Sequence, residues 1–559
     1  MQPKQTLSAA AISGQTFDYI VCGGGTSGCV IAAGLALIPD VSVLLIEAGR
    51  DSGLAPDVLV PGKYVKQLQD DKDGLWELET IPQPQLNARK LVFLRGKQIG
   101  GSSAVNYMAL ARGPAADYDV WAKMVGDDGW KWENILPLMK QLEHFDPKLP
   151  AYLERFAAPR AEDHGVSGAL KIGFGDEMVP GIEAFIQACF ETGIPLCPDI
   201  NSGNPVGVGL AQFTFGMGRD LMRRMLSWEI HVYCREQAVL CAGTFGSPRI
   251  LLLSGLGPKN TLEKLNIPVQ VDLPGCGQNM LDHSIITCEY KVNNSIPAHN
   301  QLFFDPVMLA KAEAQYAKDH TGPLAMFGSS GTLAFPRIQR LFESEEFSEL
   351  STKEKDFLME PTRPSAEIWL GSGPSVFQDD RPSESYMTHE LLLQNNLSQG
   401  TVSIRSNNPR DQMIVNPNFM NHPFDRRIAI ETVRLALNIA RTKAYQGIIE
   451  RMVHGPNIDF ATAGLDAISD EVMLDFIRKH LDQGYHSVST CRMGKASDPD
   501  AVVDSRFRVK GMKNLRVADL SVCPILTCNH TQINAYLIGL RCAREMVESH
   551  KARHQHAKL

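Results

Sequence analysis

Apolar and polar positions follow two different periods along the chain, and these periods predict both strands and helices. Residues 19–22 ("YIVC") and 41–47 ("VSVLLIE") are short apolar runs typical of buried strands. Residues 398–420 alternate around a turn at "NNPRD" and predict a pair of strands. Residues 425–442 place apolar side chains at helical spacing, which predicts a packing helix with Ile428, Ile430, Val433, Leu437 and Ile439 on its buried face.

Other stretches predict no site. The charged run at residues 340–356 ("RLFESEEFSELSTKEKD") is typical of a solvated helix or surface excursion. Residues 1–16 have no basic head followed by an apolar stretch, so we expect a flexible N-terminal tail and no secretory signal. We also find no internal repeat.

Size and charge narrow the functional classes. A chain of 559 residues exceeds one compact core, so we expect two or three domains. The formal charge of −8 and a pI near 6.0 favour neither nucleic acid nor an anionic membrane as a partner. No apolar run reaches the roughly 18–20 residues that a membrane span requires.

The cysteines and the C-terminal residues indicate the cellular compartment of the protein. None of the 12 cysteines forms a cluster with zinc spacing, so we expect no metal site. Because the chain shows no export signal, we expect reduced thiols in an intracellular compartment. The chain ends in Ala557-Lys558-Leu559, a close variant of the Ser-Lys-Leu peroxisomal address. We therefore expect the peroxisome and its import receptor, or otherwise the cytoplasm.

A glycine-rich loop between strand and helix predicts a dinucleotide site. Gly23, Gly25 and Gly28 form G-x-G-x-x-G directly after the first apolar run. This spacing permits a tight turn and close approach of the backbone to a pyrophosphate. The helix that follows begins at Thr26 and Ser27, where backbone N–H groups and the helix dipole favour phosphate. Glu47 ends the next strand, where an acid accepts bonds from a ribose; FAD and NAD both fit.

A second glycine-rich stretch lies at residues 95–114, "RGKQIGGSSAVNYMALARGP". Gly100, Gly101 and Ser102 would let the backbone come close to a bound group, although an ordinary Gly/Ser turn explains the stretch as well.

Together with these stretches, "AVLCAGTFGSPRILLLSGLGP" (238–258), "VDLPGCGQNMLDH" (271–283), "GYHSVSTCRMG" (484–494) and "NLRVADLSVCP" (514–524) resemble the glucose–methanol–choline family of flavin oxidoreductases. The motifs occur in the family's order and span nearly the whole chain. The resemblance implies an α/β (α+β overall) fold. It has a Rossmann-like FAD-binding domain assembled from discontinuous segments and a substrate domain with a large antiparallel β-sheet backed by helices.

The matches divide the chain. Residues 17–110, 236–290 and 485–549 are expected to build the FAD-binding domain. Residues 111–235 and 291–484 are expected to form the substrate-binding domain and connecting loops, and residues 550–559 a C-terminal tail. Val105 stands where some members attach FAD through a histidine, so the resemblance implies non-covalent FAD.

The resemblance also implies the catalytic residues. His486 matches the family's catalytic histidine, and we expect it to take the hydroxyl proton of an alcohol. The second position is His or Asn in the family. Alignment on Ile538-Gly539 puts Gln532 there, and a shifted register puts His530 there instead.

The resemblance also implies which residues lie near the flavin. Asn106 is expected to face the isoalloxazine, Asp519 the ribityl–pyrophosphate region, and Arg95 belongs to the stretch that approaches the cofactor. His283 in "MLDH" is expected to cap and pack rather than react.

The implied function is FAD-dependent oxidation of a small organic alcohol, with O2 or another electron acceptor restoring the flavin, in secondary metabolism. One departure bears on it: residues 219–237 are too few for the strands that precede "AVLCAG" in the family. Two alternatives therefore stay open, a hydroxynitrile-lyase-like flavoprotein without net redox and a catalytically impaired relative.

Overall fold

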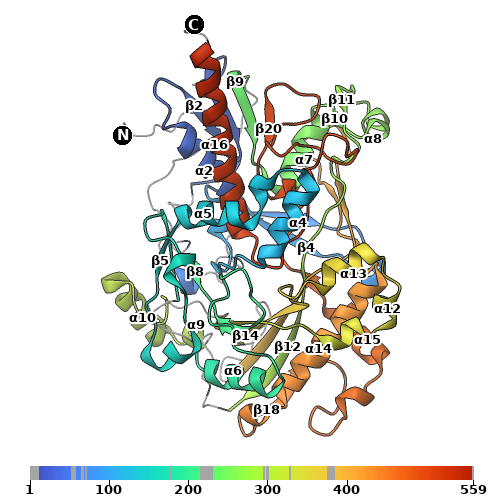
Figure 1. The fold of residues 1–559 in the computed structure, drawn as a ribbon. Coiled ribbons are helices and arrows are strands. Elements are labelled where there is room, and N and C mark those ends of the chain that lie inside the picture. The colour runs from blue at the N-terminus through green and yellow to red at the C-terminus, as the bar shows by residue number, and fades with distance from the viewer. Residues whose placement is uncertain are drawn as a thin grey trace.

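The protein was analysed as a computed structural model that describes residues 12–51, 58, 60–63, 68, 72–174, 179–214, 231–293, 296, 301–325, 329–373 and 384–556. Two sheets organise these residues, one in the upper and one in the lower part of Figure 1. Among the described residues, no helix combines the length and apolarity needed to cross a bilayer. The candidate peroxisomal address at 557–559 lies outside the described residues.

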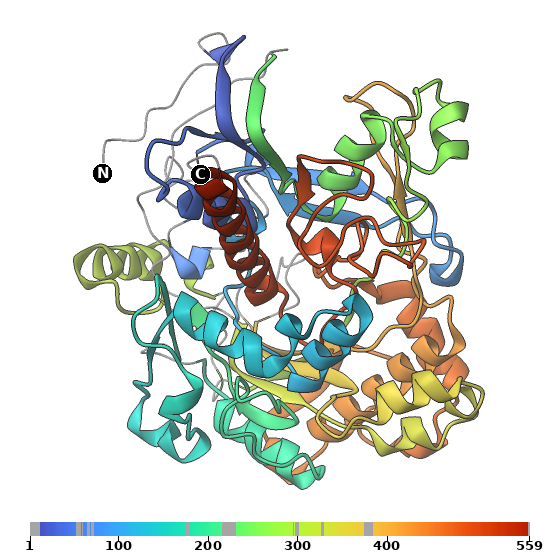
Figure 2. The same ribbon diagram turned by 45° about the horizontal axis from the view of Figure 1, so that its top comes forward.

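The first sheet has four parallel strands in the order β2–β1–β9–β20. They come from the two ends and the middle of the chain: β1 (Thr16–Cys22), β2 (Val43–Ile46), β9 (Tyr233–Leu240) and β20 (Leu515–Val517). Helix α2 (Thr26–Leu35) and the C-terminal helix α16 (Gln532–His556) pack against each other beside it (Figure 2). Their close approach depends on glycine, because a Cβ at Gly539 would lie 2.8 Å from the carbonyl oxygen of Ser27.

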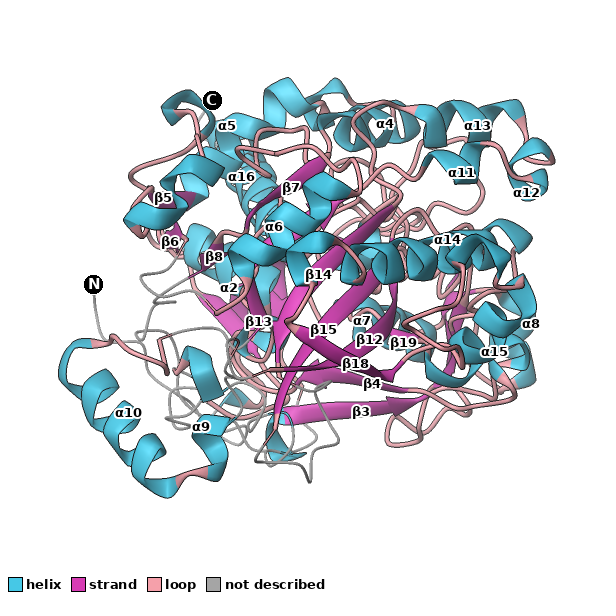
Figure 3. Cartoon of the chain, turned by 90° about the horizontal axis from the view of Figure 1, so that it is seen from below, coloured by secondary structure: helices cyan, strands magenta, loops and turns pink. Residues whose placement is uncertain are grey.

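The second sheet is antiparallel, with strands in the order β18–β12–β15–β14–β13–β7 and β19 beside β12. Helix α14 (Pro423–Ala440) lies across β12, β14 and β15, and α6 (Ile182–Glu191) packs on β13 and β7 (Figure 3). The strands are β7 (Gly207–Leu210), β12 (Ser284–Val292), β13 (Ser329–Phe335), β14 (Ala366–Ser372), β15 (Ser385–Leu393), β18 (Ile449–His454) and β19 (Asp482–Gln483).

The other elements surround these two sheets. The strands are β3 (Leu75–Glu79), β4 (Val92–Gly96), β5 (Glu143–Asp146), β6 (Leu170–Gly173), β8 (Phe213–Thr214), β10 (Leu256–Gly257), β11 (Val271–Asp272), β16 (Thr401–Ser403) and β17 (Ile414–Asn416). The helices are α4 (Ala115–Val125), α5 (Trp132–Leu142), α7 (Gly243–Leu253), α8 (Lys259–Lys264), α9 (Gln301–Phe304), α10 (Pro306–Asp319), α11 (Gln339–Phe342), α12 (Glu345–Ser348), α13 (Thr352–Met359) and α15 (Asp470–His480).

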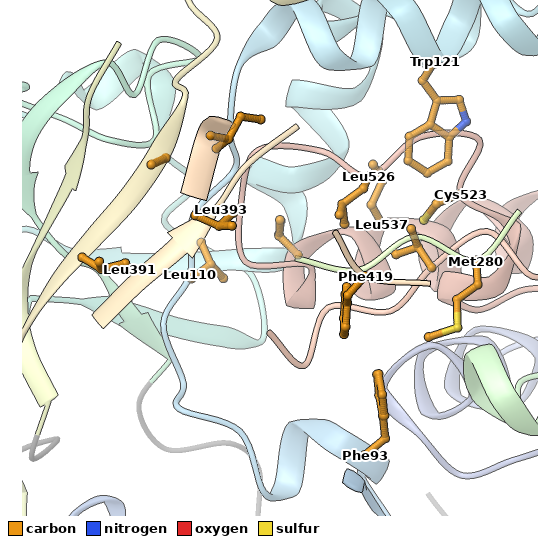
Figure 4. Packing of buried hydrophobic residues seen from close by; sticks show 14 of the residues in the cluster. Phe93, Leu110, Trp121, Met280, Leu391, Leu393, Phe419, Cys523, Leu526 and Leu537 are labelled. Carbon is orange, nitrogen blue, oxygen red and sulfur yellow. The ribbon is translucent and has the colours of Figure 1, made fainter. Parts of the chain in front are cut away.

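One hydrophobic core joins the two sheets. Residues far apart in the chain meet in it, including Phe93, Met280, Leu391 and Leu537 (Figure 4). The expected apolar face of α14 is buried in the same core, which confirms the packing helix predicted at 425–442. The strand pair predicted at 398–420 is confirmed as β16 and β17.

Three boundaries differ from the sequence expectation. Residues 12–15 are tied to the first sheet, because Ile12 is buried against Ile20 and Leu44 and Gln15 accepts the N–H of Tyr233. Residues 550–556 are the last turns of α16 rather than a tail. Strand β12 begins at 284, inside the predicted nucleotide segment 236–290, yet it pairs in the large sheet. Of the shortened segment 219–237, residues 231–237 are described, and 233–237 form the first part of β9.

A buried ion pair fixes the loop that precedes α16. Arg112 donates to both carboxylate oxygens of Glu143 at 2.7 Å, and both side chains are fully buried. The carbonyl oxygen of Arg112 accepts from Asn529 at 3.0 Å. Burial opposes the charge on Glu143, but hydrogen bonds from His164 and Arg112 outweigh it and hold its pKa below the ordinary value.

Replacing Glu143 with Gln should destabilise the protein, because Arg112 would keep a buried charge without its counter-charge. The expected loss is about 3–5 kcal/mol, or a thermal midpoint lowered by roughly 3 °C in a chain of this size. Glu162→Gln, which changes an exposed carboxylate in the neighbouring segment, is the matched control. Equal midpoints for the two variants in differential scanning calorimetry would show that the pair does not carry this stability.

Candidate functional site: a nucleotide loop and a histidine cluster

The two glycine-rich stretches predicted from the sequence lie against each other. Gly100 donates its N–H to the carbonyl oxygen of Gly24 at 2.8 Å, and Gly25 and Gly100 form an isolated β-bridge. A Cβ at Gly101 would lie 2.8 Å from the Cα of Gly25. Two backbones can approach this closely only where both residues lack side chains. The structure thus brings both predicted loops to one place, at the carboxyl end of β1.

The start of α2 is left open for an anion. Gly25 is the N-cap and no side chain caps the helix, so its first backbone N–H groups have no side-chain acceptor. Gly23 adopts a φ of +112°, and a Cβ there would lie 2.2 Å from the carbonyl oxygen of Cys241. Thr26 faces the carbonyl of Gly100, whereas Ser27 turns toward α16 and donates to the carbonyl of Ala535 at 2.7 Å.

Glu47 closes the loop from the next strand. Its carboxylate accepts the N–H of Gly24 at 2.7 Å and the N–H of Gly49 at 2.8 Å. Burial raises the pKa of Glu47, and these backbone hydrogen bonds oppose that rise. The acid therefore stands where the sequence predicted it, beside the glycine loop at the end of β2.

The other predicted cofactor residues have protein partners. Asp519 is buried and accepts from the N–H of Gly243 at 2.9 Å and from Ser247 Oγ at 2.6 Å. Asn106 accepts the N–H of Met108, and Ser102 Oγ accepts the N–H of Gly96. Each side chain shapes its own loop, so their predicted contact with a cofactor stays a prediction.

The side chain of Arg95, on β4, lies beside the histidine loop. Its guanidinium donates to Ser487 Oγ at 2.6 Å and stands 3.8 Å from Asp282. Asp282 in turn accepts the backbone N–H of His486 at 2.7 Å and Ser487 Oγ–H at 2.6 Å. Tyr485 has a φ of +63°, so this loop carries backbone strain that its hydrogen bonds hold in place.

His486 sits in a cluster of three histidines. Its Nδ1 lies 2.9 Å from Nδ1 of His283, and its ring meets the ring of His530 edge-on at a centroid distance of 5.0 Å. Burial lowers the pKa of His486 well below its usual value, and the neighbouring His530 and His283 lower it further. Burial also lowers the pKa of His283 to about 3. Both rings are therefore neutral at neutral pH.

His530, rather than Gln532, meets His486. His530 is in the loop before α16, and its Nε2 lies 2.7 Å from Glu367 on β14. Gln532 is the first residue of the helix and points its amide at Thr214 Oγ1, 3.5 Å away. Counting residues back from Ile538-Gly539 could not show which side chain meets His486. The chain turns between the loop and the helix, so His530 and Gln532 point to different partners.

Sequence reasoning also missed the buried carboxylates around His530. Glu367 accepts from Trp369 Nε1 at 2.6 Å as well as facing His530. Burial and the charge of Glu367 together raise the pKa of Glu390 to about 7, against the opposing effect of His530. Both acids belong to β14 and β15, which carry no recognisable motif. The quoted "MLDH" motif was a usable signal for His283, whose contact with His486 differs from the packing role expected for it.

Known proteins match this chain over nearly its whole length. Two family models described as GMC oxidoreductase match residues 17–231 and 396–539. A glucose methanol choline oxidoreductase, atC, from Aspergillus terreus is 30% identical over 583 aligned residues, covering 95% of this chain and 92% of that protein. Because that alignment is longer than the 559-residue chain, the relative has residues without a counterpart here.

Two more known proteins match this chain over nearly its whole length. The dehydrogenase pkfF from Emericella nidulans is 30% identical and covers 96% of this chain and 94% of its own length. The solved structure of a FAD-dependent oxidoreductase from Chaetomium thermophilum superposes with a TM-score of 0.83 at 25% identity, covering 96% of this chain and all of that chain.

The residues present fit FAD. The uncapped start of α2 suits its pyrophosphate, and Glu47 suits the ribose of its adenosine. Gln532 Oε1 and His283 Nε2 are two of the buried polar atoms that have no hydrogen-bond partner within the described part of the protein. Such polar atoms are rare in a folded protein unless a bound group or water satisfies them.

Replacing Glu47 with Ala should weaken FAD binding. The change removes a charged acceptor and frees the N–H of Gly24, and losing a charged hydrogen bond costs about 1.5–3 kcal/mol, or roughly tenfold to hundredfold in Kd. Fluorescence titration of the apoprotein with FAD measures it. Glu77→Ala, at an exposed position on β3, is the control. Equal affinities in the two variants would contradict the role of Glu47.

Proposed function

Because the chain belongs to the GMC oxidoreductases, a family of flavoproteins, we propose that it oxidises a small organic alcohol to the carbonyl compound with His486 as the base. Bound FAD supplies the acceptor for the hydride that leaves the carbinol carbon. The observation that carries the proposal is the pair of imidazoles, His486 and His530, whose rings lie 5.0 Å apart.

His486 is suited to accept the hydroxyl proton. Its lowered pKa keeps the ring neutral at neutral pH, so one ring nitrogen carries a lone pair. Which nitrogen is free depends on the contact with His283, since two neutral rings joined through Nδ1 share a single proton there. Only when that proton belongs to His486 is its Nε2 free to act as a base.

His283 is the positioning residue in this proposal. Accepting the Nδ1–H of His486 fixes the reactive tautomer and stabilises the imidazolium that forms when Nε2 takes the substrate proton. Because His283 presents its Nδ1 to His486, we assign the substrate proton to His486 and the orienting contact to His283. A neutral imidazole thus does what a carboxylate does in many other base–orienter pairs.

His530 orients the alcohol. Its Nε2–H donates to the buried carboxylate of Glu367, and Nδ1 is left for the substrate hydroxyl. Trp369 packs against the His530 ring, with the two ring centroids 5.1 Å apart. Gln532 offers a second acceptor, its unpaired Oε1.

Replacing His486 with Ala tests the central assignment. The variant should keep its yellow colour, because no nucleotide-loop residue changes, and should lose flavin reduction by a factor of about 10²–10⁴. Anaerobic stopped-flow bleaching with a panel of alcohols measures the rate. An alanine variant that is still reduced at the wild-type rate would show that the base is another group.

The same bleaching measurement on the wild-type protein separates the proposed oxidation from the two alternatives. A yellow protein that no alcohol bleaches would contradict oxidation and favour a lyase-like reaction without net redox. A folded but colourless protein that takes up no added FAD would support impairment through the short 219–237 segment. Flavin released by denaturation would support non-covalent attachment, in line with Val105.

Replacing His283 with Leu or Asn separates positioning from packing. Leu fills the space but accepts no hydrogen bond, so flavin reduction should slow by at least about tenfold with little change in substrate Kd. Asn carries Oδ1 where His283 carries Nδ1, so His283→Asn should recover most of the rate. Equally slow flavin reduction in the two variants would mean that His283 acts only by packing.

A further inference from the structure

A second group of potential ligands lies far from the histidine loop, where the C-terminal helix crosses the nucleotide sheet. Glu236 is on β9, the strand between β1 and β20, and His550 and His554 are on the last turns of α16. In Figures 1 and 2 the end of this helix lies beside β9. The proposed oxidation uses none of the three residues.

The three side chains have the geometry of an ion site. One ligand atom from each lies within 4.8 Å of the other two, and His554 Nε2 is 3.5 Å from Glu236 Oε1. His550 and His554 are four residues apart, so helical periodicity puts both imidazoles on one face. Their ring centroids are 4.2 Å apart. Among the described residues, this is the one such group of three or more candidate ligands.

We propose that Glu236, His550 and His554 bind a divalent transition-metal ion of the zinc type. Two imidazoles and one carboxylate are a common donor set for Zn²⁺, with a fourth position left for water. The partial exposure of all three side chains gives an ion access from solvent. Zinc-type ions prefer imidazole nitrogen, whereas Mg²⁺ and Ca²⁺ prefer all-oxygen sites, so the latter should bind poorly.

Tyr19 and Arg553 orient two of the three ligand side chains. The hydroxyl of Tyr19 lies 2.8 Å from His550 Nδ1, and when Nδ1–H donates to it, Nε2 keeps its lone pair for the ion. Arg553 binds Oε2 of Glu236 at 2.8 Å and leaves Oε1 on the side of His554. The arginine charge opposes a cation, so the site should favour ions that bind imidazole strongly.

The site would join the end of the chain to its beginning. Tyr19 is on β1, Glu236 on β9 and the histidines on α16, so an ion would link three elements of the nucleotide fold. Binding to the folded state alone raises thermal stability with ion concentration. The spacing test applied to the sequence missed this group because its third ligand comes from a distant strand.

Isothermal titration of the untagged, chelator-treated flavoprotein with ZnCl2 tests the proposal. One equivalent should bind, and His550→Ala, His554→Ala and Glu236→Gln should each weaken binding at least tenfold. Tyr19→Phe, which removes only the hydroxyl, should weaken it by about tenfold. His144→Ala removes an exposed histidine on β5 and should leave binding unchanged.

The thermal midpoint gives an independent readout. Zn²⁺ should raise it in the wild type and in His144→Ala, and leave it unchanged in the three ligand variants, whereas MgCl2 should raise it in none. Absence of Zn²⁺ binding in the wild type would overturn the proposal. So would wild-type affinity for Zn²⁺ in any one of the three ligand variants.

Discussion

The buried carboxylate of Asp282 is the contact on which the candidate active site depends. It accepts the backbone N–H of His486 and the hydroxyl of Ser487 and stands beside Arg95, so three distant segments meet at one group. The strained backbone at Tyr485 would relax without these bonds. Burial raises the pKa of Asp282 to about 6, while Arg95 and the hydrogen bonds oppose the rise. The charge that holds the loop is therefore complete only above that pH.

The rest of the site follows from how the two sheets face each other. The parallel sheet carries the first glycine loop, at the end of β1, and the antiparallel sheet carries Glu367 and Glu390. The loop before α16 crosses from one to the other with His530, and a buried network through Asn529 and Arg112 fixes its path. No single segment contains enough of the site to form it alone, since each imidazole takes its orientation from a partner on another segment.

The sequence predicted what local chemistry determines. Glycines that must meet without side chains, the acid that ends β2 and the loop of His486 all have backbone or spacing reasons that can be read along the chain. Tertiary contacts were not readable in this way. The contact of His486 with His530 could not be predicted, because a loop-to-helix turn decides which side chain meets His486. Glu367 gave no signal because its partner lies on a segment far away in sequence, and residues 550–556 looked like a tail because their contacts are to β1 and β9.

The pairing of α2 with α16 has a consequence for how the protein is made. The first nucleotide-binding turn leaves the ribosome early, but the helix that packs on it, and β20 at the sheet edge, are synthesised only after the strands of the antiparallel sheet. Domains usually fold as units during synthesis, from the N-terminus onward. Here the glycine loop must wait, partly unsupported, for almost the entire chain. Flavin capture is thus expected late, and a chain that stops before Gln532 would leave α2 at the beginning of the fold without the helix that packs on it.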